Sequence, residues 1–273
     1  MIKIYTDKIY TKADILCQID KLNIPKGSIV LAHTAYRLIG KVDGGAKTVL
    51  DAFIEYFTEN GGLFCVPTHT WASIKEPIIL DMNENKTCLG AFSDYAASDE
   101  RGIRSLNPSH SMMVFGDRKR ALEFIKDDAF VTSGTAPESC YGKLFTEGGY
   151  VLLIGVSHVR NTYLHAVEEI IGTPDRLAEI PVDVSIKLRS GEIIPRKIRP
   201  HKTSFTSDVS LRFSKYETAF RYHRAITDGF IGNAPAQACN AVIMKETMEK
   251  IFKNSCGIDP LADEKLIPPA WYR

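Results

Sequence analysis

The hydrophobic and polar positions of the first seventy residues follow the order helix, strand, helix, strand. Residues 11–24 carry apolar side chains at helical spacing behind a capping threonine, and they predict an amphipathic helix. Residues 25–34 form a turn and then a continuous apolar run, which is the pattern of a buried strand. Residues 44–62 predict a helix with glycines at both ends, and the apolar run at residues 63–67 is stopped by a proline. The order strand, helix, strand predicts a right-handed crossover between two parallel strands.

The periodicity weakens between residues 71 and 107, where polar residues are frequent. This stretch predicts a long functional loop with a short helix near residues 92–97. Residues 112–116 predict a third strand, and residues 117–128 predict a third helix. The continuous apolar run at residues 150–156 then predicts a strand buried on both faces.

The pattern changes after Pro181, where apolar and polar residues alternate around a Ser-Gly turn and predict an antiparallel hairpin. Later helices are predicted near residues 214–227 and 240–253. We therefore predict an α/β fold whose central sheet is mixed but mostly parallel, with helices on both faces. The chain shows no repeat or linker, so we expect one domain over residues 1–273, with the hairpin elaboration at residues 181–210 in its C-terminal third.

Charge and cysteine content narrow the class of protein. The formal net charge is +1 without a long block of like charges, which argues against a nucleic-acid partner. No apolar run approaches the roughly 18 residues of a membrane span, and the mixed, charged N-terminus is not a signal peptide. Six scattered cysteines without a CxxC pair predict reduced, structural thiols. We expect a soluble cytoplasmic enzyme without a membrane partner.

The glycine pair Gly44-Gly45 is the first segment that could carry chemistry. Backbone N–H groups at the start of a helix bind phosphate oxygens, and glycines allow a pyrophosphate to approach closely. The segment matches neither a Walker A loop nor a GxGxxG fingerprint. The same two glycines could simply turn the chain into the helix, so both interpretations stand.

A polar turn with a proline places Ser109, His110 and Ser111 directly before the strand at residues 112–116. Their hydroxyl and imidazole groups could line a cleft, or could cap and hydrogen-bond the turn.

The third segment is "NTYLHAVEE", which follows the buried strand at residues 150–156. Asn161 is a suitable N-cap, so His165 falls in the first turns of a helix, with Glu168 three residues and Glu169 four residues further on. A carboxylate can orient a neutral imidazole and stabilise its charged form, while the helix N-terminus keeps the ring neutral. A neutral, oriented imidazole is suited to act as a general base. A half-buried helical histidine beside solvated glutamates would show the same spacing.

Taken together, five ordered blocks resemble the aminoglycoside 3-N-acetyltransferase family. They are "LAHTAYRLIGKVDGGAKTVLDAF", "GGLFCVPTHT", "RSLNPSHSMMVFG", "GKLFTEGGYVLLIGV" and "NTYLHAVEE", and they cover roughly residues 10–180. The resemblance implies an α/β fold of the family's own type, binding of acetyl-CoA, and transfer of an acyl group to an amine of an amino sugar. It implies no metal.

The resemblance also assigns residues. It implies that His165 is the catalytic base, partnered by Glu168, and that Thr162 binds the thioester or its oxyanion. We assign the residues of the first-strand loop and of the polar turn to CoA: His33, Thr34, Ala35, Arg37, Gly44, Gly45, Ser109, His110 and Ser111. We assign Thr68, His69 and His201 to the amine acceptor. A homodimer is compatible with the family, although the sequence does not set the oligomeric state.

Two departures from the family pattern bear on the acceptor. Asn107 stands where the family usually has histidine before the proline, and Pro200 or His201 stands where a carboxylate is expected. The basic stretch "RKIRPHK" would suit an anionic, nucleotide-linked amino sugar better than a polycationic aminoglycoside. A homologue that binds CoA but has lost catalysis is a further alternative.

Two other chemistries are open at this stage. His69, His110, His165 and His201 with Glu168 could ligate a metal in a hydrolase, although none has a spacing such as HExxH. Cys65 or Cys140 could form an acyl-enzyme, although neither has a base nearby in the sequence.

Overall fold

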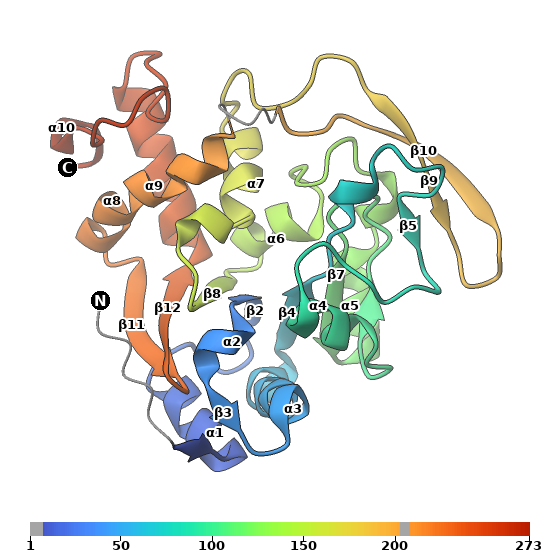
Figure 1. The fold of residues 1–273 in the computed structure, drawn as a ribbon. Helices are drawn as coiled ribbons and strands as arrows, with labels where there is room; N and C mark the ends of the chain where they lie inside the picture. The colour runs from blue at the N-terminus through green and yellow to red at the C-terminus, as the bar shows by residue number, and fades with distance from the viewer. Residues whose placement is uncertain (1–7, 203–207) are drawn as a thin grey trace.

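The computed structural model describes residues 8–202 and 208–273. A seven-stranded sheet forms its centre, with the order β11-β12-β8-β2-β4-β7-β6 (Figure 1). In that order the strands are β11 (Ile226–Ile231), β12 (Ala234–Asn240), β8 (Tyr150–Ile154), β2 (Ile29–Thr34), β4 (Leu63–Pro67), β7 (Met112–Gly116) and β6 (Ile103–Arg104).

Side-chain alternation along the central strands explains why helices cover both faces of this sheet. Ile29 and Leu31 of β2 belong to one core, and Val30 and Ala32 belong to the other, because successive side chains point to opposite faces. The helices that contribute buried residues to the second core are α1 (Lys12–Asp20), α2 (Tyr36–Ile39), α3 (Gly45–Thr58) and α4 (Ala91–Ala97). Those of the first core are α5 (Arg118–Ile125), α6 (Cys140–Thr146), α7 (Tyr163–Ile170), α8 (Glu217–Tyr222), α9 (Ala241–Asn254) and α10 (Pro269–Tyr272).

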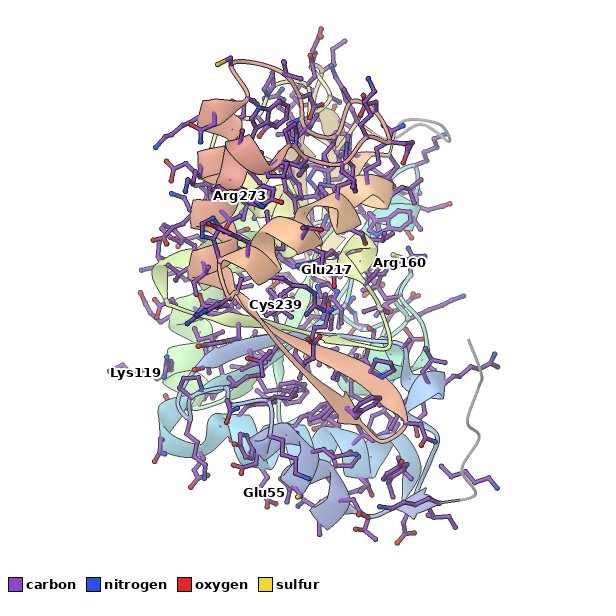
Figure 2. All side chains as sticks on the ribbon, turned by 90° about the vertical axis from the view of Figure 1, so that its left-hand side faces the viewer. Glu55, Lys119, Arg160, Glu217, Cys239 and Arg273 are labelled. Atoms are coloured by element: carbon purple, nitrogen blue, oxygen red, sulfur yellow. The ribbon has the colours of Figure 1, made fainter. Side chains whose placement is uncertain are left out.

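Figure 2 shows the two helical layers from the side of the β11–β12 hairpin. Glu217, at the start of α8, lies on one side of the hairpin that carries Cys239, and Glu55 of α3 lies on the other. The predicted arrangement of helices on both faces is therefore confirmed.

The prediction that the sheet is mostly parallel is wrong, although the sheet is mixed as expected. Only β2–β4 and β2–β8 pair in parallel, whereas β11–β12, β12–β8, β4–β7 and β6–β7 are antiparallel. The predicted crossover from β2 through α3 to β4 accounts for one of the parallel pairs. The other strands pair antiparallel with their neighbours, so β12 and β7 run opposite to β2, whereas β11 and β6 run in the same direction as β2.

The hairpin at the start of the predicted elaboration is confirmed, but it lies outside the central sheet. β9 (Val182–Lys187) pairs antiparallel with β10 (Ile193–Ile198), and β5 (Leu80–Asp81) adds in parallel to β9. This small sheet has its own core of five buried residues: Ile79, Leu80, Val184, Ile186 and Ile198. Residues 203–207 of the predicted elaboration, and residues 1–7 of the predicted domain, lie outside the described residues.

The predicted helix near residues 214–227 is much shorter than expected. A 3₁₀ segment covers Val209–Tyr216, α8 covers only six residues, and β11 begins at Ile226. Arg224 adopts a positive φ of 59°, a left-handed conformation that ends a helix and turns the chain into the strand.

The remaining elements are short. β1 (Ile9–Tyr10) pairs in parallel with β3 (Lys41–Val42), and α2 (Tyr36–Ile39) follows β2. Within the described ranges, no helix combines the length and the apolar character that crossing a bilayer requires.

Candidate active site

The candidate site lies at one edge of the central sheet, where three strands end and a fourth begins. Thr34 at the end of β2 pairs with Ile154 at the end of β8. Pro67 at the end of β4 pairs with Met112, the first residue of β7. Loops that follow or precede these strands carry His69, His110 and the helix with His165, so segments far apart in the chain meet at this edge.

Four imidazole rings form a row in this region. The rings of His165 and His201 are parallel, with centroids 4.2 Å apart, and His201 meets His110 edge-on at 5.3 Å. His110 lies 4.5 Å from His69, whose Nε2 is 2.6 Å from the hydroxyl of Tyr141. We call these four histidines the histidine row.

The local structure around His165 and His201 explains how these two rings are held. His165 lies on α7, whose Leu164 and Val167 are fully buried in the core, and its ring meets Phe213 at 4.7 Å. His201 follows β10 and is placed by a bridge to Leu177. These contacts bring two residues 36 positions apart in the sequence into ring contact.

His110 depends on a close approach of the backbone at Gly134. A Cβ at Gly134 would lie 2.0 Å from Nδ1 of His110, so only glycine leaves room for the ring. The carbonyl of Gly134 accepts a hydrogen bond from Asn107, whose own side-chain oxygen accepts from the backbone N–H of His110. Asn107, the residue that departs from the family pattern, thus shapes the turn that presents His110.

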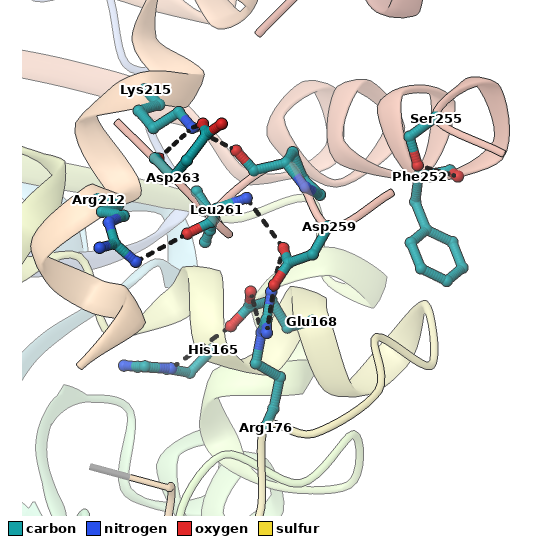
Figure 3. A network of polar contacts seen from close by, with 11 residues as sticks. His165, Glu168, Arg176, Arg212, Lys215, Phe252, Ser255, Asp259, Leu261 and Asp263 are labelled. Carbon is teal, nitrogen blue, oxygen red and sulfur yellow. Dashed lines mark hydrogen bonds and ion pairs between the residues drawn. The ribbon is translucent and has the colours of Figure 1, made fainter. Parts of the chain in front are cut away.

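Glu168 is fully buried beside His165. One carboxylate oxygen, Oε2, lies 3.7 Å from Nδ1 of His165, which is longer than a hydrogen bond. The other oxygen, Oε1, accepts a 2.7 Å hydrogen bond from Nε of Arg176 (Figure 3). Burial raises the pKa of Glu168 to about 7, although the charge and hydrogen bond of Arg176 act to lower it.

Glu169 lies beside His201 and two hydroxyl groups. Its two oxygens accept hydrogen bonds from Ser133 and Thr135 at 2.5 and 2.6 Å, and Oε1 lies 3.6 Å from Nε2 of His201. Burial acts to raise the pKa of Glu169, but the interaction with His201 and the hydrogen bonds from Ser133 and Thr135 outweigh it and keep the pKa below its ordinary value. The two adjacent glutamates therefore have different surroundings, with Glu168 beside Nδ1 of His165 and Glu169 beside Nε2 of His201.

Burial keeps His69, His110 and His165 neutral near physiological pH. It lowers the pKa of His165 well below the ordinary value, and the neighbouring His201 lowers it further, while the carboxylates of Asp208 and Glu169 act in the opposite direction. Burial likewise lowers the pKa of His69 and His110 well below the ordinary value. Neutral imidazoles with one free nitrogen can accept protons.

The first-strand loop contributes unpaired polar atoms to the same edge. Nε2 of His33 and Oγ1 of Thr34 are buried and have no hydrogen-bond partner within the described residues. Burial lowers the pKa of His33 to about 3, and His33 in turn contributes to lowering the pKa of His69. Buried polar atoms without partners are rare in folded proteins, so these two are candidates for ligand contact.

The other predicted residues of this loop turn the chain toward α3. Ala35 donates its backbone N–H to the carbonyl of Ile154, and Arg37 is exposed. Gly44 and Gly45 have φ angles of 74° and 66°, a conformation that favours glycine, at the start of α3.

Thr68 and Ser111 lie beneath the histidine row and are fully buried. Their hydroxyl oxygens are 3.0 Å apart, and both accept from Nε of Arg104 at 3.2 Å. Ser109 contacts the row directly, since its hydroxyl is 2.8 Å from Nδ1 of His110. Arg104 itself is buried and donates a further hydrogen bond to the carbonyl of Thr68.

The predicted N-cap of α7 is wrong. Thr162, not Asn161, occupies the N-cap position, and its side chain makes no capping hydrogen bond. A 3₁₀ turn at His158–Arg160 precedes the helix, and Asn161 is buried with its amide nitrogen 3.1 Å from Nδ1 of His158. Thr162 is half-buried and lies one turn before His165.

Neither alternative chemistry finds a suitable arrangement. Over residues 8–202 and 208–273, no three histidine, cysteine, aspartate or glutamate side chains are placed to hold a metal ion. Cys65 and Cys140 are both fully buried, and burial raises the pKa of each thiol, which leaves them protonated and poorly nucleophilic.

Several residues around the row have no signal in the sequence. Arg176 and Asp259 are 83 positions apart, and Thr135 lies 66 positions before the histidine that it contacts. Tyr141 lies 72 positions after His69, and Arg104 lies 36 positions after Thr68. Only Glu169, adjacent to Glu168, could have been suspected from its spacing to His165.

The chain was then compared with known proteins. The model of the family described as aminoglycoside 3-N-acetyltransferase matches residues 31–253. An aminoglycoside N(3')-acetyltransferase-like protein of Bacillus subtilis, YokD, is 28% identical, with 58% of this chain and 64% of that protein aligned. Aminoglycoside N(3)-acetyltransferase IV of Salmonella sp is 25% identical, with 60% of this chain and 61% of that protein aligned. The chain thus matches less than two thirds of the length of these two curated relatives.

Solved structures share the fold over nearly the whole chain. The crystal structure of YokD from Bacillus subtilis superposes with a TM-score of 0.78 at 22% identity, over 93% of this chain and 97% of that one. The structure of AAC-IIIb in a binary complex with CoASH gives a TM-score of 0.74 at 20% identity, over 88% and 94% of the two chains.

Proposed function

The chain belongs to the aminoglycoside 3-N-acetyltransferase family, and on this premise we propose that it transfers an acetyl group from acetyl-CoA to an amine of an amino sugar. The observation that carries the proposal is the pair His165 and Glu168. A buried carboxylate lies 3.7 Å from Nδ1 of a neutral imidazole, at the edge of the sheet where strands β2, β4 and β8 end. A general base that accepts a proton from an amine needs this combination of neutrality and an orienting acceptor.

In the proposed mechanism His165 takes a proton from the acceptor amine through Nε2. Its Nδ1–H points toward Oε2 of Glu168, which selects the tautomer that leaves Nε2 free and stabilises the ring once it is charged. The amine nitrogen forms a bond to the acyl carbon, and the carbon–sulfur bond breaks with its electron pair remaining on sulfur. General-base help of this kind contributes typically about 10²–10⁴ in rate. Thr162 and the backbone N–H groups at the start of α7 are the donors that we propose for the carbonyl oxygen.

We place the CoA end of the site on the first-strand loop. His33 and Thr34 carry buried polar atoms without partners, and these fit the amide and carbonyl groups of a pantetheine chain. Acetyl-CoA supplies an activated acyl group whose thiolate leaves readily, because thiol pKa values lie near 8.5. Gly44 and Gly45 leave the backbone at the start of α3 open to a phosphate, and Arg37 is exposed beside them. Ala35 lies in the same loop, and we include it among the residues proposed to contact CoA.

We place the acceptor beside the histidine row. His201 and His69 present imidazole rings to it, and Ser109 and His110, which we propose for the CoA end of the site, contact the same row. Thr68 and Ser111 have no exposed surface, and both accept hydrogen bonds from Arg104. We therefore propose that they support the neighbouring histidines and do not contact the acceptor themselves.

Charges around the row support a cationic acceptor over an anionic one. Carboxylates of both Glu169 and Asp208 act on the pKa of His165, so negative charge is present close to the base. Lys197 of β10 and Lys202 after it, both from the basic stretch, form ion pairs with Asp183 and Asp175 at 3.0 and 3.1 Å. This pairing weakens the case for a nucleotide-linked acceptor and favours an amino sugar with free ammonium groups.

Release of free thiol from acetyl-CoA tests the proposal. Gentamicin, apramycin and sisomicin are suitable first acceptors because relatives of the same fold have been solved with them. Turnover with any of the three supports the proposed acceptor class, and turnover only with nucleotide-linked amino sugars would replace that class. Acetyl-CoA binding without turnover on any amine would contradict the proposal.

A further inference from the structure

Arg176 connects Glu168 to the C-terminal segment of the chain (Figure 3). It lies in the loop after α7, and only 7% of the residue is exposed. Nε donates to Oε1 of Glu168 at 2.7 Å, and Nη1 and Nη2 donate to the two oxygens of Asp259 at 3.0 and 2.8 Å. A planar guanidinium fixed on both sides in this way has one orientation available to it.

The two oxygens of Glu168 have different partners because of this arrangement. Oε1 is taken by Arg176, whereas Oε2 is buried, has no hydrogen-bond partner within the described residues, and lies 3.7 Å from Nδ1 of His165. A short movement of the imidazole would close the remaining gap to hydrogen-bond length. Arg176 thereby determines which oxygen faces the ring.

The C-terminal partner is itself held in place. The carboxylate of Asp259 accepts the backbone N–H of Leu261, whose carbonyl accepts from Arg212 at 3.0 Å. Lys215 donates to the carbonyls of Pro260 and Asp263 at 2.6 and 2.7 Å. The anchor of Arg176 therefore rests on the 3₁₀ segment Val209–Tyr216, which also carries Phe213 against the ring of His165.

The groups that face Glu168 come from five parts of the chain. Arg176 is the nearest cation, His165 shares α7, Tyr216 lies on the 3₁₀ segment, and Asp259 adds a negative charge from the C-terminal segment. His201 acts on it from beyond β10. Since burial already raises the pKa of Glu168 to about 7 with Arg176 in place, a neutral side chain at position 176 would leave Glu168 protonated over most of the physiological range.

We propose that Arg176 is a positioning residue that favours the ionised form of Glu168 and directs its Oε2 at His165, so that the ring presents an unprotonated Nε2 to the acceptor. This inference rests on the proposed function of His165 as general base. A protonated or rotated Glu168 would no longer select the Nδ1–H tautomer, and the catalytic nitrogen would carry a proton in part of the population.

The test compares three full-length variants. Arg176→Met removes the charge at similar bulk, Arg176→Lys keeps a charge without the fork, and Asp259→Asn loosens the C-terminal anchor while leaving Arg176 beside Glu168. ¹⁵N spectra of histidine-labelled protein report the tautomer of each ring, and the signal that is lost in His165→Gln identifies His165. Circular dichroism confirms that each variant is folded.

We expect Nδ1–H at His165 in the wild type and in Asp259→Asn, and a mixture of tautomers in Arg176→Met. In thiol-release kinetics, kcat should fall at least tenfold in Arg176→Met with less than a twofold change in the KM for acetyl-CoA, and Arg176→Lys should recover part of the loss. The pH at which kcat is half-maximal should also shift in Arg176→Met.

An unchanged tautomer and pH profile in folded Arg176→Met would overturn the proposal. Equal losses in Asp259→Asn and Arg176→Met would also overturn it, because they would assign Arg176 to anchoring the C-terminal segment. The spectra need no turnover, so a wild type that acetylates no amine would contradict the proposed function while the tautomer measurement still decides the role of Arg176.

Discussion

The ring of His201 lies against the ring of His165, with 4.2 Å between centroids and 16° between planes. Nε2 of His201 is also 2.8 Å from the hydroxyl of Thr135, so the stacked ring is fixed from its far side. His201 therefore limits the rotation of the proposed base.

Replacing His201 tests the role of this ring contact. We expect His201→Ala to raise the KM for the amine acceptor about tenfold with a smaller effect on kcat, since an aromatic pair contributes about 0.5–1.5 kcal/mol beyond its buried area. His201→Phe is the matched variant, because it retains the stacked ring and loses only the hydrogen bond to Thr135. Steady-state kinetics with varied acceptor measure both, and equal acceptor KM values in His201→Ala and the wild type would contradict the assignment.

Removing the proposed base should separate binding from turnover. His165→Ala is expected to fold and to bind CoA, with kcat lowered at least 100-fold, because general-base catalysis is worth about 10²–10⁴. Calorimetry with CoA and the thiol-release assay measure the two properties. His223→Ala is a suitable control, since His223 lies at the end of α8 and bonds to the carbonyl of Tyr272. Turnover near the wild-type rate in His165→Ala would falsify the mechanism.

A methyl group at Gly134 should destabilise the protein through His110. The added Cβ would lie 2.0 Å from Nδ1 of His110, and overpacking of this kind costs about 1–3 kcal/mol. Urea unfolding of Gly134→Ala measures the loss. In a His110→Ala background the same substitution should cost much less, because the clashing ring is gone. An identical cost in both backgrounds would mean that the strain arises elsewhere.

The pH dependence of stability should follow the neutral histidines. Burial lowers the pKa of five histidines in the folded protein: His33, His69, His110, His158 and His165. The unfolded chain binds protons at these positions below about pH 6.5, whereas the folded chain does not, so the free energy of unfolding falls as the pH falls below that value. Each neutral histidine contributes up to about 1.4 kcal/mol per pH unit.

Glu168 changes the free energy of unfolding with pH in the opposite direction. Its pKa of about 7 in the folded protein lies above the ordinary 4.5, so the folded state binds this proton more tightly and gains stability as the pH falls through that window. Burial also raises the pKa of Asp128, so two carboxyl groups oppose five histidines, and we expect a net loss of stability between pH 7.5 and pH 5.5 in urea unfolding. His33→Gln should reduce the difference between the two pH values. A midpoint that is equal or higher at pH 5.5 would show that the histidines are not neutral in the folded state.

Local pattern was sufficient for the elements whose signals lie within a few residues. The helix after Thr11 begins with the predicted cap, and the side chains of Thr11 and Asp14 form a capping box. β2, α3 and β4 appear in the predicted order with β2 and β4 parallel, and the hairpin at Val182–Ile198 is antiparallel as expected. The pairing of β4 with β7 and of β12 with β8 was not predictable, because strand direction depends on how distant segments return to the sheet.

β11 and β12 were missed for a related reason. Their sequence contains Gly229, Pro235 and small residues, which weaken the strand pattern. The hairpin that they form joins the central sheet because β12 pairs with the buried strand β8. Tertiary contacts here override local propensity. The predicted helix extending to residue 227 was wrong because the strand pairing begins at Ile226.

The candidate site divides in the same way. By itself the sequence determined that His165 and Glu168 share a helix face, since a spacing of three residues places both side chains on one side of a turn. Only the tertiary structure brought His201 onto His165 and joined Glu168 to Arg176 and Asp259. Helical geometry is set by adjacent backbone hydrogen bonds and can be calculated from spacing, whereas contacts between distant segments depend on how the whole chain packs around its two cores.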